Sequence, residues 1–267
     1  MSNATRSAGR RGTFVTLALL LSVILVAAAA ERAVAAGCSF EPQGEGRVAA
    51  VIDARTFRLE DGREVRLAGI EPMATEKGNR TSALTALVAG REVTLRGEDD
   101  TPDRYGRQPA FAFVDGVETS VQSLLLEQGE ALVSATEGNK DCALALFAAE
   151  SMAREAKRGI WADPAAIKNA ESPGDVLTGI GRLTVVEGKV LSVRQAGTTT
   201  YLNFGRSWTR GFAVTISRRV LTALEATGVA VKSLENRRIR VRGWVEARRG
   251  PRIEVLRVGQ IELLGTN

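Results

Sequence analysis

Short runs of alternating apolar and polar residues dominate the sequence from Gly44 to Phe113. A period of two places successive side chains on opposite faces of a strand, so this pattern predicts β-strands. The segment GRVAAVIDARTFRLEDGREVRLAGI contains three such runs, and Asp61-Gly62 marks a hairpin turn between the second and third. A helical segment, RTSALTALVAG, and two further strand-like runs follow. Five strands with a helix after the third is the order of an OB-type β-barrel.

Two more helices are predicted after these strands. The segment SVQSLLLEQGEALV has Val121, Leu124 and Leu125 at helical spacing, and its helical pattern ends at Gly129. A longer helix is predicted over DCALALFAAESMAREAKRGIW, with Gly159 as its stop. On one face this helix places Leu144, Phe147, Ala148, Ser151 and Met152.

The second half of the chain repeats this order after a polar segment, ADPAAIKNAESPGD. Five strand-like runs lie between Leu183 and Leu264, and the helical run RRVLTALEATG falls between the third and fourth. The sequence therefore predicts a mainly β fold with helices (α+β), with two OB barrels in tandem. The predicted parts are a signal peptide at 1–36, a first barrel domain at 37–165, a linker at 166–175 and a basic OB-like barrel at 176–267.

The first 36 residues have the order of a secretory signal peptide. Three arginines precede an apolar stretch of 17 residues, and the small residues AVAAG follow it. This stretch is at the short end of what spans a bilayer, so cleavage near Ala36 is preferred over a retained anchor. The segment AAGC also resembles a lipoprotein box at Cys38, although Ala35 stands where leucine is usual. We expect an exported protein, periplasmic or secreted, with no stable membrane span after cleavage.

An exported chain can form disulfides, and this chain has two cysteines, Cys38 and Cys142. Their pairing would close a loop of roughly 100 residues, which contributes about 4–5 kcal/mol in the chain-entropy model. We predict this single disulfide.

The composition excludes several kinds of chemistry. The chain has no histidine, so Ser-His-Asp and Cys-His sites, histidine bases and histidine metal ligands are all excluded. Charge is divided unevenly, because residues 37–165 carry a net charge of −7 while 166–267 carry 17 basic and 8 acidic residues, a net +9. This asymmetry favours two domains with different roles.

Five segments between residues 44 and 165 form a recognisable pattern: VIDARTFRL, VRLAGIEP, DRYGRQPAFAFVDG, LLLEQGEALV and EAKRGIW. Together they resemble the staphylococcal nuclease (thermonuclease) family. The resemblance implies an OB barrel packed on helices and calcium-dependent cleavage of phosphodiesters. It also implies that two aspartates and a carbonyl hold the metal, that a glutamate acts on the attacking water, and that two arginines stabilise charge on the phosphate.

The resemblance assigns roles to four residues of this chain. Arg66 and Arg107 fall on the two catalytic arginines, and Glu71 falls on the second metal-binding aspartate. Asp53 begins the segment that reads Asp-Gly-Asp-Thr in the family and is the other candidate metal ligand.

Two positions depart from the family pattern. The segment DART (53–56) has Arg55 where the family has a metal-binding aspartate, and EPMA (71–74) has Ala74 where the family has its glutamate. Two unit charges about 4 Å apart repel by roughly 4 kcal/mol at an effective dielectric of 20, or about three powers of ten in affinity. Ca²⁺ is therefore the cofactor implied by resemblance, but its binding is predicted to be weak or absent.

Other interpretations of these residues stay open. Glu76, two residues after Ala74, is a candidate substitute for the missing glutamate. Arg66 and Arg107 also suit ordinary surface ion pairs, with partners among Asp53, Glu71 and Asp103.

The strand RRIRVRGW carries the basic character of the C-terminal region. Its alternation places Arg238, Arg240, Arg242 and Trp244 on one face. Basic grooves with an aromatic platform are how OB folds hold single strands, so this face is a candidate site for single-stranded nucleic acid or another polyanion. The alternative is a solvated face on a barrel that acts as a scaffold or contacts proteins.

Three functions follow. The first is an exported nuclease-like protein with a degenerate calcium site, acting as a phosphate, nucleic-acid or envelope binding module. The second is an active secreted or periplasmic endonuclease, and the third is a structural or protein-interaction module. Metal-dependent cleavage of a single strand selects the second, and salt-dependent binding without cleavage selects the first.

Overall fold

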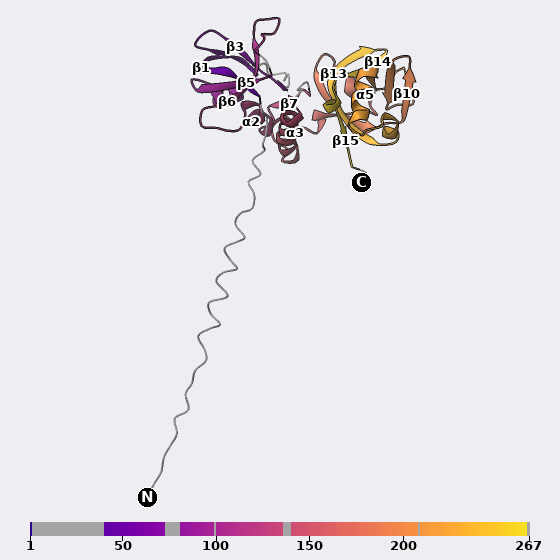
Figure 1. The fold of residues 1–267 in the computed structure, drawn as a ribbon. Helices are drawn as coiled ribbons and strands as arrows, with labels where there is room; N and C mark the ends of the chain where they lie inside the picture. The colour runs from indigo at the N-terminus through magenta and orange to yellow at the C-terminus, as the bar shows by residue number, and fades with distance from the viewer. Residues whose placement is uncertain (2–39, 73–80, 99, 136–139, 208, 266–267) are drawn as a thin grey trace. The chain divides into compact units, whose positions relative to one another are not determined.

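The computed structural model of this chain describes residues 1, 40–72, 81–98, 100–135, 140–207 and 209–265. The predicted signal peptide beyond Met1, together with Cys38 and Ala74, lies outside these residues. The chain divides into two units, Met1–Ala36 and Gly37–Asn267, and the second unit contains every element described below (Figure 1). No described helix is both long enough and apolar enough to cross a membrane.

Five strands close a barrel: β1 (Glu41–Asp53), β2 (Thr56–Leu59), β3 (Glu64–Leu67), β5 (Glu92–Gly97) and β6 (Gln108–Val114). They are hydrogen-bonded in the order β1-β2-β3-β6-β5, and β5 pairs with β1 to complete the ring. The β2–β3 hairpin turns at Asp61-Gly62 as the sequence predicts, and β3 runs parallel to β6. Alternate side chains such as Phe57, Leu67 and Leu95 fill the interior. The predicted OB-type barrel is confirmed.

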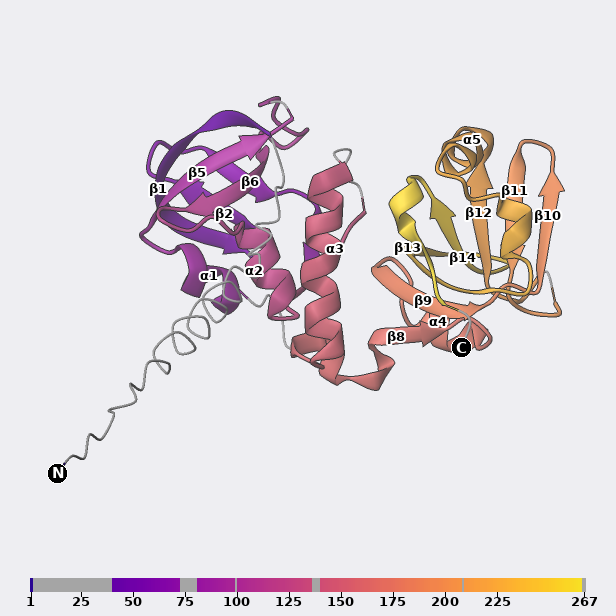
Figure 2. The same cartoon turned by 60° about the horizontal axis from the view of Figure 1, so that its bottom comes forward.

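Three helices and a two-stranded sheet complete the first half of the chain: α1 (Ser82–Val88), α2 (Val121–Glu127), α3 (Lys140–Glu155), β4 (Ile70–Pro72) and β7 (Ala131–Val133). The Ser120 side chain begins α2 by accepting a hydrogen bond from the Ser123 amide. β4 and β7 are antiparallel, with Ile70 opposite Val133. Figure 2 shows α2 beside α3.

The face that the spacing predicts for α3 is not the face that packs. Leu144 and Met152 share that face, but their side chains are 57% and 55% exposed. The packed side includes a charged residue, Glu150, which apolar periodicity does not indicate. The residues that α3 buries are Cys142, Leu146, Ala149, Glu150 and Ala153.

The remaining strands form one sheet: β8 (Ile167–Asn169), β9 (Leu183–Lys189), β10 (Ser192–Ala196), β11 (Thr199–Asn203), β12 (Ala213–Ser217), β13 (Arg238–Arg248), β14 (Gly250–Val255) and β15 (Ile261–Leu263). Its order is β10-β11-β12-β14-β13-β9-β8, with β15 beside β13. α5 (Arg218–Ala226) follows β12 and buries Val220 and Leu224. The structure has eight strands here where the sequence predicted five. The first predicted run forms β9 and β10, the last forms β14 and β15, and β8 is additional.

The segment predicted to be a linker, 166–175, contains β8 and the start of α4 (Pro173–Leu177). β8 runs parallel to β9, with Lys168 opposite Val186. This connection is therefore part of the C-terminal sheet. Short 3₁₀ helices complete the fold: η1 (Gly159–Ala162), η2 (Pro164–Ala166), η3 (Val231–Leu234) and η4 (Val258–Gln260).

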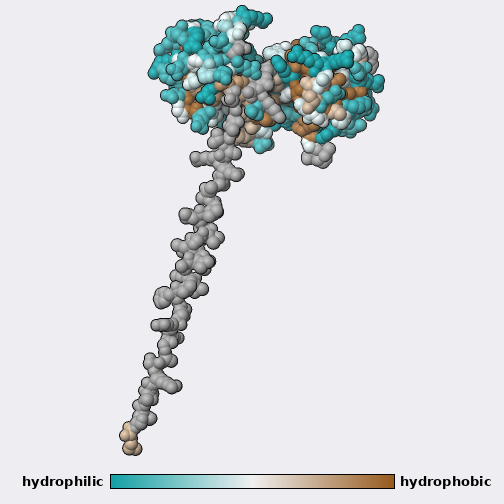
Figure 3. All heavy atoms as spheres, viewed as in Figure 1, coloured by the Kyte–Doolittle hydropathy of each residue, from teal (hydrophilic) through white to brown (hydrophobic). Residues whose placement is uncertain are grey.

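A small hydrophobic cluster contains residues from both halves of the chain. Leu132 of β7 and Ala153 of α3 pack with Trp161, and with Leu183 and Val185 of β9. The first barrel region and the C-terminal sheet thus share buried apolar surface and are not joined by the chain alone. Figure 3 shows that hydrophilic side chains cover most of the visible face of both regions.

Candidate functional site

Two strand pairings bring the predicted arginines to one end of the barrel. In the β2–β3 hairpin Thr56 lies opposite Arg66, which places Arg66 beside Arg55. β3 then pairs with β6, where Arg66 lies opposite Pro109, two residues after Arg107. The structure therefore brings together residues that are about 40 positions apart in the sequence, as the resemblance requires.

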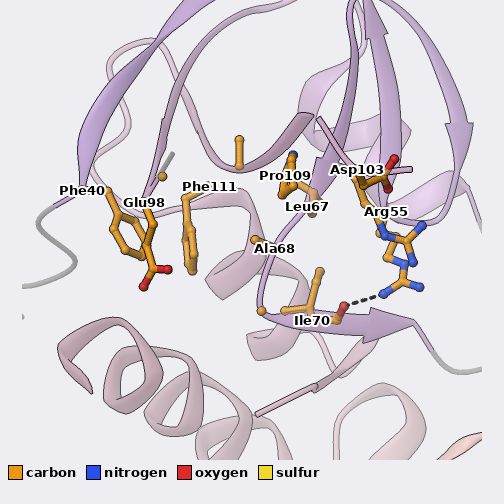
Figure 4. A pocket seen from close by; sticks show the side chains of 13 residues that line it. Phe40, Arg55, Leu67, Ala68, Ile70, Glu98, Asp103, Pro109 and Phe111 are labelled. Atoms are coloured by element: carbon orange, nitrogen blue, oxygen red, sulfur yellow. Dashed lines mark hydrogen bonds between the residues drawn. The ribbon is translucent and has the colours of Figure 1, made fainter. Parts of the chain in front are cut away.

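A pocket with a volume of about 420 Å³ opens at this end of the barrel. The rings of Phe40 and Phe111, with centroids 5.0 Å apart, form an apolar wall. Arg55 and Asp103 lie on the opposite side (Figure 4), and Arg66 also lines the pocket. The pocket thus combines two tilted aromatic rings with guanidinium groups and with the carboxylates of Glu98 and Asp103.

Arg55 is held by three neighbours. Its Nη1 donates a hydrogen bond to the Ile70 carbonyl at 2.9 Å (Figure 4) and forms an ion pair with the Glu71 carboxylate. Its backbone amide donates to Asp53 Oδ1 at 2.9 Å. The guanidinium therefore binds the carboxylate and the carbonyl that stand nearest to it, and both are oxygen acceptors that a hard cation would need.

The Glu71 carboxyl is subject to two opposing influences. Burial is the larger and raises the pKa of Glu71, while the positive charge of Arg55 and its hydrogen bond lower it. The net pKa is above the ordinary value because the ion pair does not fully offset the loss of hydration.

Arg107 is bound to one carboxylate within its own loop. Its Nη2 and Nε donate to Asp103 Oδ2 at 2.7 and 3.0 Å. Burial disfavours the ionised Asp103, but hydrogen bonds from Arg107 and from the Tyr105 and Arg107 amides outweigh this and lower its pKa. The ring of Tyr105 lies under the guanidinium of Arg107 at 4.9 Å. Ion pairing with Asp103, one of the two interpretations of Arg107, is thus present in the structure.

Arg66 is the pocket's least engaged cation. Within the part of the chain that the structure describes, its guanidinium has no ion-pair or hydrogen-bond partner, although it lines the pocket. A partly buried guanidinium that faces a pocket has donors available for an anion.

The residues present do not fit a calcium site. Across the described ranges no group of three or more aspartate, glutamate, histidine or cysteine side chains is arranged to hold a metal ion. Arg55, at the position that the resemblance predicts for a metal ligand, contributes N–H donors, and its positive charge repels a cation. Asp53 and Glu71 thus have Arg55 as their shared neighbour.

Three residues that the predictions name, Cys38, Ala74 and Glu76, lie outside the part of the chain that the structure describes. Ala74 and Glu76 belong to the segment 73–80, and Cys38 precedes the first described strand. Cys142 is fully buried in α3. The disulfide and the substitution by Glu76 stay predictions.

The prediction that this face of β13 is exposed is wrong at Arg242. Its side chain is fully buried, and its guanidinium donates to Glu150 at 2.8 and 2.9 Å and also to Glu262. The Phe147 ring lies 4.6 Å from it. Because strand alternation alone cannot distinguish the solvent side from an interface, the sequence placed this arginine on a free surface.

The other members of that face are also paired. Arg240 has a side chain only 12% exposed and contacts Glu187 and Glu262, each at 3.0 Å. Arg238 is exposed and pairs with Glu187 at 3.2 Å. Trp244 is half exposed and lines a second pocket. The predicted row of free guanidinium groups is therefore a ladder of ion pairs.

Glu150 is the structurally decisive residue that sequence reasoning missed. Its Oε2 accepts a hydrogen bond from the Val133 amide at 2.7 Å, and Arg242 donates to the Val133 carbonyl at 3.2 Å. The pair thus satisfies both backbone groups of Val133 on the edge of β7 that faces away from β4. The available signal was a lone glutamate among apolar residues in ALALFAAESMA.

Comparison with known families agrees with the resemblance in the first half. Residues 64–163 match the family model described as staphylococcal nuclease homologue. This range includes Arg66, Glu71 and Arg107, and it begins after Asp53 and Arg55. No curated protein matches the chain.

Proposed function

From a chain whose residues 64–163 form a staphylococcal nuclease homologue domain, we propose a protein that binds phosphodiester groups without calcium-dependent cleavage. The observation that carries this proposal is the position of Arg55. Its guanidinium binds Glu71 and the Ile70 carbonyl, so a fixed positive charge stands where the resemblance predicts a metal ion.

The same charge suits an anionic ligand. Arg55, Arg66 and Arg107 place three guanidinium groups at one end of the barrel, and Arg66 offers its donors to the pocket. Guanidinium groups bind phosphate oxygens through paired, charge-assisted hydrogen bonds. The Phe40–Phe111 wall supplies an apolar surface beside them, which favours a ligand that carries both a phosphate and a flat ring.

The loss of cleavage follows from what the site lacks. Cleavage in this family needs a metal to neutralise the developing charge and a carboxylate to act on water. Arg55 and Ala74 replace the corresponding carboxylates. The proposed place of action is outside the cytosol, which rests on the signal-like order of residues 1–36.

Two measurements on the purified protein test this proposal. Calorimetric titration with Ca²⁺ should give no binding, and a fluorescent dinucleotide should bind with and without Ca²⁺. Arg66→Gln should weaken dinucleotide binding about tenfold to a hundredfold, as expected for the loss of a charged hydrogen bond. Micromolar Ca²⁺ binding that Glu71→Ala abolishes, or Ca²⁺-dependent cleavage of a single strand, would select an active nuclease instead.

The reverse change gives a sharper test. Arg55→Asp combined with Ala74→Glu should restore measurable Ca²⁺ binding and some cleavage, because it returns both missing carboxylates. Arg58→Asp with Ala74→Glu is the matched control, since Arg58 is an exposed arginine three residues further along the same hairpin. A gain in the control equal to that in the test variant would show that charge in general, and not the Arg55 position, governs metal binding.

A further inference from the structure

The C-terminal sheet has a second group of arginines at the end where β11 leads into β12 and β13 turns into β14. The connection from β11 to β12 contains two exposed arginines. The β13–β14 hairpin contributes three more, at the end of β13, in the turn and near the start of β14, and the last of these is partly buried. We call this group the arginine end; its members are Arg206, Arg210, Arg248, Arg249 and Arg252.

Backbone contacts bring the two segments together. The β11–β12 connection folds back on itself, because the Phe204 amide donates to the Phe212 carbonyl and the Gly211 amide to the Ser207 carbonyl. The β13–β14 turn lies directly on this connection. A Cβ added at Gly250 would be 2.9 Å from the Gly211 carbonyl oxygen, a separation too short for any side chain.

The arginine end differs from the β13 face in how its charges are neutralised. On the β13 face Arg238, Arg240 and Arg242 all contact glutamates. At the arginine end Arg248 pairs with Glu246 at 3.1 Å, and the other four arginines have no ion-pair partner among the described residues.

Two acidic side chains border the arginine end. Glu246 lies opposite Arg252 in the β13–β14 pairing, and Glu254 lies two residues beyond Arg252. Five positive charges therefore face two negative ones, so the surface keeps an excess of positive charge. This surface accounts for part of the net +9 of residues 166–267.

We propose that the arginine end binds a single strand of nucleic acid through its phosphates. Guanidinium groups without carboxylate partners attract phosphates, and binding several of them releases counterions. The ligand class rests on the proposed function of the first barrel, and the surface itself rests on the unpaired arginines. The structure thus assigns strand binding to this end of the sheet and not to the β13 face that the sequence suggested.

Arg249 can be replaced so that a positive charge is lost without disturbing the fold. Its backbone is in the left-handed region, with φ of 67°, where glycine is favoured over other residues. Arg249→Gly therefore removes a charge while relieving the backbone, and it is not expected to unfold the turn. The test variant combines Arg249→Gly with Arg206→Gln and Arg210→Gln. The matched control is Arg47→Gln, Arg58→Gln and Arg238→Gln, three exposed arginines that have carboxylate partners.

The measurement is fluorescence anisotropy of a labelled single strand on the full chain over a salt series. If each of the three arginines binds one phosphate, the slope of log affinity against log salt should become shallower by about 2 in the test variant. The control should keep the wild-type slope. Equal slopes in wild type and test variant would overturn the inference, as would dextran sulfate binding as tightly as the strand and with the same dependence on the three arginines.

The dinucleotide assay distinguishes binding at the pocket of the first barrel from strand binding at the arginine end. A dinucleotide is too short to need the arginine end, so its binding should depend on Arg66 and be unchanged in the test variant. If the dinucleotide binds and the strand's slope is unchanged, the inference fails and the proposed function stands. If the dinucleotide does not bind but the slope becomes shallower, the proposed function fails and the arginine end stands.

Discussion

Glu71 shows how burial and pairing compete at a single carboxyl group. Its ion pair with Arg55 would by itself favour the ionised form, yet burial raises its pKa. Asp103, four residues from its partner Arg107, shows the opposite balance, because hydrogen bonds to the carboxylate outweigh burial and lower its pKa. The two carboxyls should therefore affect stability in opposite directions as pH changes.

Glu71→Gln is expected to gain stability relative to wild type as pH rises above the ordinary glutamate pKa of 4.5. A raised folded-state pKa means that the folded protein binds this proton more tightly than the unfolded chain does. The free energy of unfolding of wild type therefore falls as pH rises through the folded pKa, and the glutamine variant lacks this loss. Urea denaturation at a series of pH values measures the difference.

Asp103→Asn is the control variant, for which the change in stability with pH should have the opposite sign. Its folded-state pKa is lowered, so wild type gains stability as pH rises from that lowered pKa to the ordinary aspartate value of 3.8, and the variant does not. The variant should therefore lose stability relative to wild type over that range. Parallel pH courses for the two variants would contradict the assigned directions.

Part of the site can be predicted from the sequence because the signals for it are local. Arg55 comes directly before β2, Arg66 lies in β3 and Glu71 lies in β4, so one short segment whose spacing the motif fixes holds all three. The partners of Arg240 and Arg242 come from α3, β9 and β15, and nothing within RRIRVRGW indicates them. The row of arginines on this strand therefore predicted side chains exposed to solvent, whereas in the structure Arg240 and Arg242 contact glutamates.

At the scale of elements, the ends of α2 and α3 meet through two glycines. Gly129 and Gly159 both have left-handed backbones, with φ of 71° and 54°. The Ile160 amide donates to the Gly129 carbonyl at 2.9 Å. A Cβ on Gly129 would lie 2.2 Å from the Arg158 carbonyl oxygen, so only glycine fits at this junction.

Gly129→Ala is expected to destabilise the protein more than Gly116→Ala. Gly116 has nearly the same backbone, with φ of 74°, but nothing lies within 4 Å of an added Cβ. The control should lose about 1–2 kcal/mol from the left-handed conformation alone. Gly129→Ala should lose about 1–3 kcal/mol more from the steric overlap. Equal losses in denaturant titrations would show that the junction relaxes without cost.

The elements that the sequence predicted are those with long local patterns. The barrel strands, the Asp61-Gly62 hairpin and the α3 helix follow from alternation, turn residues and helical spacing. β4, β7, β8 and β15 have three residues each, which is too short for a period to show. Their strand character comes from distant partners, as Ile70 opposite Val133 illustrates.

At the scale of the whole molecule, a ladder of charges connects the two halves. Glu150 of α3 pairs with Arg242 of β13, which pairs with Glu262 of β15. Burial opposes ionisation of Glu262, but the positive charges of Arg242, Arg240 and Arg154 outweigh it and lower its pKa. The first barrel region and the C-terminal sheet should therefore unfold together.

Arg242→Met is expected to cost about 3–5 kcal/mol, because it leaves the fully buried Glu150 without its main countercharge. Combining it with Glu150→Met should recover part of that loss, since no unpaired carboxylate is then left at position 150, although the Val133 amide and carbonyl lose their side-chain partners. Denaturant titrations of wild type, both single variants and the double variant measure the coupling. Losses that simply add in the double variant would show that the pair does not connect the two halves energetically.

The same pairing has a consequence for the order in which the chain is made. Arg242 follows Glu150 by 92 residues, so at about 5–20 residues per second it is synthesised about 5–20 s later. Until then Glu150 has no Arg242 beside it, and the Val133 carbonyl on the outer edge of β7 lacks its donor. An open strand edge is where one chain pairs with another. The nascent first barrel should therefore be most vulnerable to association in those seconds, and arrival of the C-terminal sheet ends that interval.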